Sequence, residues 1–178
     1  MGAIPEVNGV LLLGYAKACV NFKYIAPKYF KDILVKVKPE GWYSFEYMQE
    51  FEKVIKFVYN DPCPIFERIG EEMMYIWYND GLNPEKINSG VEFLEIQKDS
   101  KSYHSVVRGD LDIVGGFYLD ILDKEKGYAE ITSTTYSPVS LEKGIIKGGM
   151  KVMGDITEVE VEIDNNFDGK RFIINFII

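Results

Sequence analysis

The sequence has few of the residues from which catalytic and metal sites are usually built. Its 178 residues include one histidine, His104, and two cysteines, Cys19 and Cys63. Two cysteines in a chain of this length do not form a disulfide framework. Neither has a second cysteine or a histidine close by, as a zinc site would need. Gly-x-Ser-x-Gly, the motif of a nucleophile elbow, is absent. We therefore expect reduced thiols in a cytoplasmic protein, and we find no catalytic set.

Positive charge and long hydrophobic runs are also scarce. The 28 acidic residues outnumber the 20 basic ones, which gives a net charge of -8. This balance argues against nucleic acid or an anionic membrane surface as the main partner, because both attract clustered Lys and Arg. The apolar stretch near the N-terminus is interrupted by Gly14 and Lys17 and is too short to cross a bilayer. We expect no membrane span.

The spacing of apolar residues changes from helical to alternating near the middle of the chain. Helical spacing predicts helices at residues 7–22, 26–37, 44–61, 65–81, 83–97 and 137–153. Alternation predicts strands at residues 113–122, 128–136, 156–164 and 171–178, the last one central because it is apolar on both faces. We expect an α+β fold, in which N-terminal helices pack on a C-terminal antiparallel sheet of about four strands with one intervening helix. The whole chain, residues 1–178, is expected to be one domain.

A run of hydroxyl residues from Thr132 to Ser137 could suggest a nucleophile or a phosphate-binding loop. We interpret it as a strand that leads into a helix, with Ser137 as N-cap and Pro138 in the first turn. Successive strand hydroxyls point to opposite faces, so they do not all converge on one substrate. Gly148 and Gly149 come late in the helix, not before its N-terminus where a phosphate would bind.

Two stretches carry a resemblance to a known group of domains. They are "SLEKGIIKGGMKVMGDITEVEVEIDNNFDGKRFIINFI" and "GWYSFEYMQEFEKVIKFVYND" followed by "IFERIGEEMMYIW". Both resemble the superfamily of ligand-binding domains in nitric-oxide signalling and Golgi transport. That superfamily contains haem-nitric-oxide/oxygen-binding domains, 4-vinyl-reductase-type domains and TRAPP trafficking subunits. The resemblance implies a sensor or carrier domain for a small molecule.

The sequence departs from the haem-binding branch of that superfamily. The resemblance implies a proximal histidine on a helix and a Tyr-x-Ser-x-Arg motif. The only histidine is His104, in "KSYHSVVRGD", and the strand "YAEITSTTY" lacks the motif. We therefore expect a domain without haem, in which His104 is a metal ligand only if haem is found.

Aromatic and sulfur-containing side chains mark the candidate binding site. Met73 and Trp77 lie on a predicted helix, and Phe117 and Tyr118 lie on the first strand of the sheet. If the helices pack over the sheet, these four side chains could line an apolar pocket between the layers. Our leading hypothesis is a non-catalytic sensor or carrier for an apolar or amphipathic ligand, with the cofactor unknown.

Three alternatives remain open at this point. One is an interaction or dimerisation subunit with the same fold and a filled core, as a homodimer or with a signalling partner. A second is a haem-binding gas sensor, and a third is an enzyme whose catalytic residues the sequence does not reveal.

Overall fold

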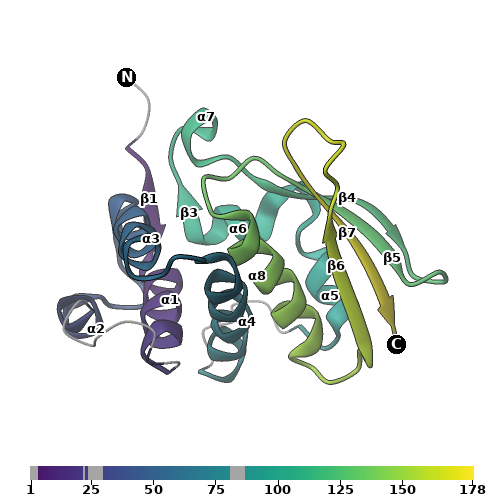
Figure 1. Cartoon of the computed structure of the whole chain (residues 1–178), viewed down its shortest axis with the longest axis horizontal. Helices are drawn as coiled ribbons and strands as arrows, with labels where there is room; N and C mark the ends of the chain where they lie inside the picture. Colours follow the sequence, from purple (N-terminus) through teal and green to yellow (C-terminus); the bar gives the residue numbers. More distant parts are fainter. Residues whose placement is uncertain (1–3, 22, 24–29, 81–86) are drawn as a thin grey trace.

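The computed structural model describes residues 4–21, 23, 30–80 and 87–178, and its helices and main sheet form two layers (Figure 1). The helical layer contains α1 (Gly9–Asn21), α2 (Lys31–Lys36), α3 (Glu46–Val58) and α4 (Cys63–Asn79). The second layer is an antiparallel sheet of β4 (Phe117–Asp123), β5 (Tyr128–Ser133), β6 (Glu158–Ile163) and β7 (Lys170–Ile177). Helix α8 (Val139–Lys151) lies between them. The predicted α+β fold class is confirmed.

The sheet has the strand order β4-β5-β7-β6, so β7 is a central strand as its two apolar faces predicted. Phe172, Ile174 and Phe176 of β7 are buried, on the face that α8 covers. Three glutamates of β6 are exposed on the other face: Glu158, Glu160 and Glu162. One face of the sheet is therefore core and the other faces solvent.

Helix α8 belongs to both hydrophobic cores. Its Leu141 packs into the cluster of the helical layer, together with Phe66 and Ile69 of α4. Its Ile146 and Met150 pack into the cluster under the sheet. The two layers are therefore joined through opposite sides of one helix.

Glycines allow α4 and α8 to approach each other closely. A Cβ placed on Gly144 would lie 1.9 Å from the carbonyl oxygen of Glu67, and one on Gly70 would lie 2.2 Å from that of Leu141. Gly148 faces Glu71 in the same way, at 2.6 Å. No side chain fits between the two backbones at these points, so glycine sets the distance between the helices.

The segment between the layers is built from short elements, which are α5 (Gly90–Glu95), the 3₁₀ helix η2 (Lys98–Ser100), α6 (Lys101–Val106) and α7 (Leu111–Val114). The first lies within the helix predicted at residues 83–97, and the sequence did not reveal the other three. The strand predicted from residue 113 begins only at Phe117, because residues 111–114 form α7. Ser89 caps α5, and the first residues of the helices predicted at 26–37 and 83–97 lie outside the described residues.

A small sheet with the order β2-β1-β3 was also not predicted. It contains β1 (Glu6–Asn8), β2 (Trp42–Ser44) and β3 (Val107–Arg108), which are too short to show a period of two. Arg108 joins the three strands, since its guanidinium lies 2.6 Å from Glu6 and 4.1 Å from the ring centre of Trp42. The sheet attaches the end of α6 to the helical layer.

Glu52 of α3 is a buried acid, with 4% of its side chain exposed. Burial raises the pKa of its carboxyl to about 7, and the charge of Glu142 adds to the rise. Lys56, 3.6 Å away, and Lys170 lower this pKa without cancelling the effect of burial. The folded protein therefore binds a proton at Glu52 more tightly than the unfolded chain does.

We predict that Gly144→Ala destabilises the fold by about 2 kcal/mol. The clash with the Glu67 carbonyl should cost about 3 kcal/mol, while alanine gains about 1 kcal/mol in helix propensity. The matched control is Gly14→Ala in α1, where a Cβ meets no atom within 4 Å. It should stabilise by about 1 kcal/mol. Urea unfolding of both variants measures the difference, and equal effects would contradict the close packing.

We predict that Glu52→Gln flattens the dependence of stability on pH. A raised pKa stabilises the fold fully below the ordinary value of 4.5, and this stabilisation is lost as pH rises through about 7. As the pH rises from about 5 to about 8, the free energy of unfolding should fall in both proteins. The fall should be smaller in the variant than in the wild type, by up to about 3 kcal/mol. The exposed neighbour Glu50, changed to Gln, serves as control and should keep the wild-type slope.

Candidate functional site

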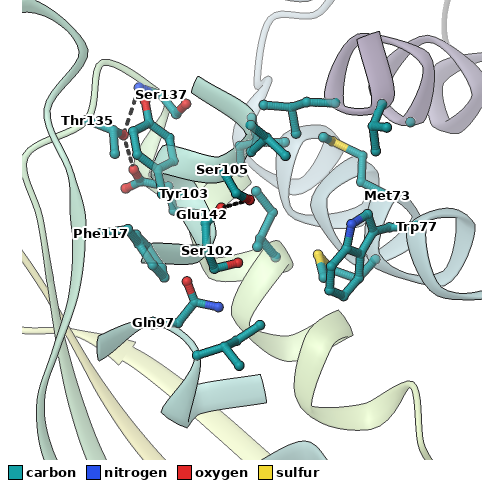
Figure 2. Close-up of a pocket in the computed structure, with 18 of the residues that line it drawn as sticks. Met73, Trp77, Gln97, Ser102, Tyr103, Ser105, Phe117, Thr135, Ser137 and Glu142 are labelled. Carbon is teal, nitrogen blue, oxygen red and sulfur yellow. Dashed lines mark hydrogen bonds between the residues drawn. The ribbon is translucent and has the colours of Figure 1, made fainter. Parts of the chain in front are cut away.

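A cavity of about 130 Å³ lies between the helical layer, α8 and the start of the sheet (Figure 2). Its wall takes side chains from both layers and from the short helices between them. Figure 2 shows Met73 and Trp77 on one side and Thr135, Ser137 and Glu142 on the other. The cavity therefore has an apolar end and a polar end, as is typical of small-molecule sites.

The apolar end is lined by methionines and by a position without a side chain. Met48 comes from α3, and Met73 and Met74 come from α4. Gly14 of α1 also lines the cavity, and a Cβ placed there would meet no atom within 4 Å. Methionine is flexible and adapts to different ligand shapes, and the space beside Gly14 is left open by the sequence itself.

Three of the four predicted ligand-binding residues line this cavity. They are Met73 and Trp77 of α4 and Phe117 at the start of β4. Tyr118 does not line it, because neighbouring strand residues point to opposite faces. Ligand binding by all four residues stays a prediction.

At the polar end, a buried carboxylate collects the donors around it. Glu142 of α8 accepts hydrogen bonds from the hydroxyls of Ser133, at 2.7 Å, and Thr135. The ammonium of Lys170 lies 3.3 Å from the carboxylate and donates to the backbone carbonyls of Thr135, at 2.7 Å, and Ser137, at 2.6 Å. Burial raises the pKa of Glu142, while Lys170 and the two hydroxyls lower it.

The hydroxyl run is thus divided between two roles. Ser133 and Thr135 face Glu142, whereas Thr132 bonds to Asp120 and Thr134 accepts from the backbone of Gly116. The predicted alternation is confirmed. Ser137 is not the N-cap of α8, since Pro138 occupies that position.

Sequence reasoning missed Glu142, Lys170, Thr135 and Tyr103. A glutamate in "SLEKG" reads as a solvated helix residue, and nothing in the chain links it to a lysine twenty-eight positions later. One signal was present, because Glu142, Ile146 and Met150 follow each other at intervals of four. This spacing places Glu142 on the face of α8 that carries two core residues.

Comparison with known proteins relates the whole arrangement to one fold. No family model and no curated protein matches the sequence. A solved structure of an oxygen-binding H-NOX domain related to soluble guanylate cyclases matches at 15% identity with a TM-score of 0.62, covering 95% of this chain and 94% of that one. The S. oneidensis H-NOX protein in its Fe(II)NO state matches at 10% identity with a TM-score of 0.65, covering 96% of this chain and 99% of that one. A third H-NOX structure, from work on H-NOX activation, matches at 13% identity with a TM-score of 0.67. The match covers 99% of this chain and 96% of that one.

The chain has an H-NOX-like fold. The resemblance to haem-nitric-oxide/oxygen-binding domains is therefore confirmed at the level of the fold. Identities of 10–15% show architecture and carry no ligand from one protein to the other.

His104, the one histidine that could hold a haem iron, does not line the cavity of this H-NOX-like fold. His104 lies on α6, but its Nε2 is 3.0 Å from the carbonyl oxygen of Gly115, to which it donates. Its neighbours Ser102, Tyr103, Ser105 and Val106 line the cavity, and His104 does not. The lining side chains of the described residues include no imidazole and no thiol. The volume of about 130 Å³ is also smaller than the roughly 300–1,000 Å³ of pockets for larger ligands.

We predict that Lys170→Met costs about 3 kcal/mol of stability, since it leaves the carboxylate of Glu142 buried without a cation. Lys170→Arg keeps the charge and should change stability by less than about 1 kcal/mol. The control is Lys124→Met, which breaks an exposed ion pair with Glu95 and should also cost less than about 1 kcal/mol. Urea unfolding compares the three, and a Lys170→Met protein as stable as the Lys124→Met protein would refute the role of the pair.

Proposed function

We propose that the chain is a non-catalytic small-molecule sensor of the H-NOX-like fold, which binds an apolar or amphipathic ligand without haem. The whole chain would act as one ligand-binding domain. The observation that carries this proposal is the cavity between the layers, with its methionine wall and the open space beside Gly14. A cavity of about 150 Å³ is known to bind benzene, so the volume suits a compact ligand.

A ligand in this position would touch both layers. Met48 and Met73 belong to the helical layer, Leu141 to α8 and Phe117 to the sheet. A ligand changes the arrangement of two layers only if it binds one arrangement better than another. Because side chains from both layers line the cavity, an arrangement in which the layers lie closer together gives the ligand more contacts on two sides. The ligand would therefore bind that arrangement with higher affinity.

A haem-binding gas sensor is the second candidate function, and the comparisons favour it. The similar structures include an oxygen complex and an Fe(II)NO state. For this chain to bind haem through histidine, His104 would have to leave the Gly115 carbonyl and turn into the cavity, and the cavity would have to widen. The cavity side chains support the hypothesis of a haem-free ligand site, whereas the fold supports the hypothesis of a haem-binding sensor.

Location and partners remain proposals. No helix in the described part of the chain is long and apolar enough to cross a membrane. Cys19 is buried and Cys63 is exposed, and both are free thiols, which suits the reducing cytoplasm. A partner, either a second copy of the chain in a homodimer or a separate signalling protein, would recognise the changed arrangement of the two layers.

We predict that toluene binds the wild-type protein and that Gly14→Leu weakens this binding at least tenfold. The leucine side chain would occupy the open space beside Gly14 and should also raise the melting temperature of the ligand-free protein. Gly14→Ala, which fills less of the space, should give an intermediate loss. Calorimetric titration measures all three affinities. Equal affinity for the wild type and Gly14→Leu would show that toluene binds elsewhere.

The haem alternative has its own test. Protein expressed with added haem precursor should show no Soret band if the haem-free reading is right. A Soret band that disappears in His104→Ala would establish the haem-binding reading in its place.

A further inference from the structure

Several hydrogen-bond donors in the cavity lining are engaged within the protein. Tyr103 donates to the carbonyl of Val114 at 2.9 Å, Gln97 to that of Phe93 at 3.1 Å, and Ser105 to that of Ser102 at 2.6 Å. Thr135 donates to Glu142. A ligand acceptor would compete with protein carbonyls and with Glu142 for these hydrogens.

Glu142 is the strongest acceptor in the lining, and one of its oxygens has capacity left. Oε1 accepts from Ser133 and Thr135 and lies 3.4 Å from the Lys170 ammonium. Oε2 has the Lys170 ammonium, at 3.3 Å, as its hydrogen-bond partner. A carboxylate oxygen accepts two hydrogen bonds, so Oε2 can take another donor. The side chain is 3% exposed, so water replaces such a donor poorly.

Lys170 is not available to the ligand in the same way. Its ammonium has three hydrogens, and it contacts the carbonyls of Thr135 and Ser137 as well as Glu142. The cation therefore balances the charge of Glu142 from outside the cavity lining, since Lys170 is not among the lining residues. Burial raises the pKa of Glu142, and a further donor to the carboxylate would offset this cost of desolvation.

We propose that the cavity selects compact apolar molecules that carry one hydrogen-bond donor, a hydroxyl or an N–H, which is donated to Glu142. This inference rests on the proposed ligand-binding function and names the chemical class of the ligand. The apolar body lies against Met73 and Trp77, and the donor lies at the opposite end, beside Thr135. A molecule without a donor would leave Oε2 of Glu142 with Lys170 as its hydrogen-bond partner.

The test compares three probes of nearly equal size on the wild-type protein by calorimetric titration. Phenol carries a donor, toluene carries neither donor nor strong acceptor, and fluorobenzene carries only a weak acceptor. Phenol should bind at least tenfold more tightly than toluene, since a hydrogen bond to a charged group is worth about 1.5–3 kcal/mol. Fluorobenzene should bind no better than toluene. This series needs no variant and so does not depend on the folding of one.

A variant then assigns the preference to the carboxylate. In Glu142→Gln the advantage of phenol over toluene should fall by about tenfold, while toluene binds within about threefold of its wild-type affinity. Toluene binding without any advantage for phenol would overturn the inference and leave the proposed function standing. A phenol advantage that persists unchanged in Glu142→Gln would also overturn it. If none of the three probes binds the wild type, the proposed ligand cavity fails together with the inference.

Discussion

The close contact between α4 and α8 sets the distance between the helical layer and the sheet. Gly70, Gly144 and Gly148 allow the two backbones to approach until a single methyl group would not fit. Because α8 packs with its other side under the sheet, this contact also positions the sheet relative to α1 and α3. The cavity occupies the space next to this contact, where larger side chains keep the layers apart. The size of the cavity therefore depends on the distance between the α4 and α8 backbones, which the glycines determine.

The cavity persists because of which side chains surround it. Gly14 contributes no side chain, and methionines fill the apolar end without forming a rigid wall. At the other end, the ion pair of Glu142 with Lys170 and two hydroxyls keeps a polar surface where an apolar core would close up. A buried charge costs free energy unless it is paired and hydrogen-bonded, and here each donor near Glu142 lowers that cost. The arrangement is a pocket with one polar anchor, set between two layers that share one helix.

The sequence allowed the layers to be predicted, and the cavity only in part. Long apolar periods identified α3, α4, α8 and the four strands, because each element buries enough of one face to show its period. The strands of the small sheet have two or three residues, which is too few for any period. The buried role of Glu142 depends on Ser133, Thr135 and Lys170, which meet it only in the folded chain. Met73, Trp77 and Phe117 could be predicted as lining residues because they lie on regular elements whose inner faces were readable.

The central claim, that the space between the layers is a ligand site, can be tested most directly through its methionines. With ¹³C-labelled methionine methyl groups, the resonances of Met48, Met73 and Met74 report on the cavity, and that of Met150 reports on the core under the sheet. Titration with toluene should shift the three cavity resonances and leave Met150 in place. A shift of Met150 alone, or no shift of the three cavity resonances at saturating toluene, would contradict the claim.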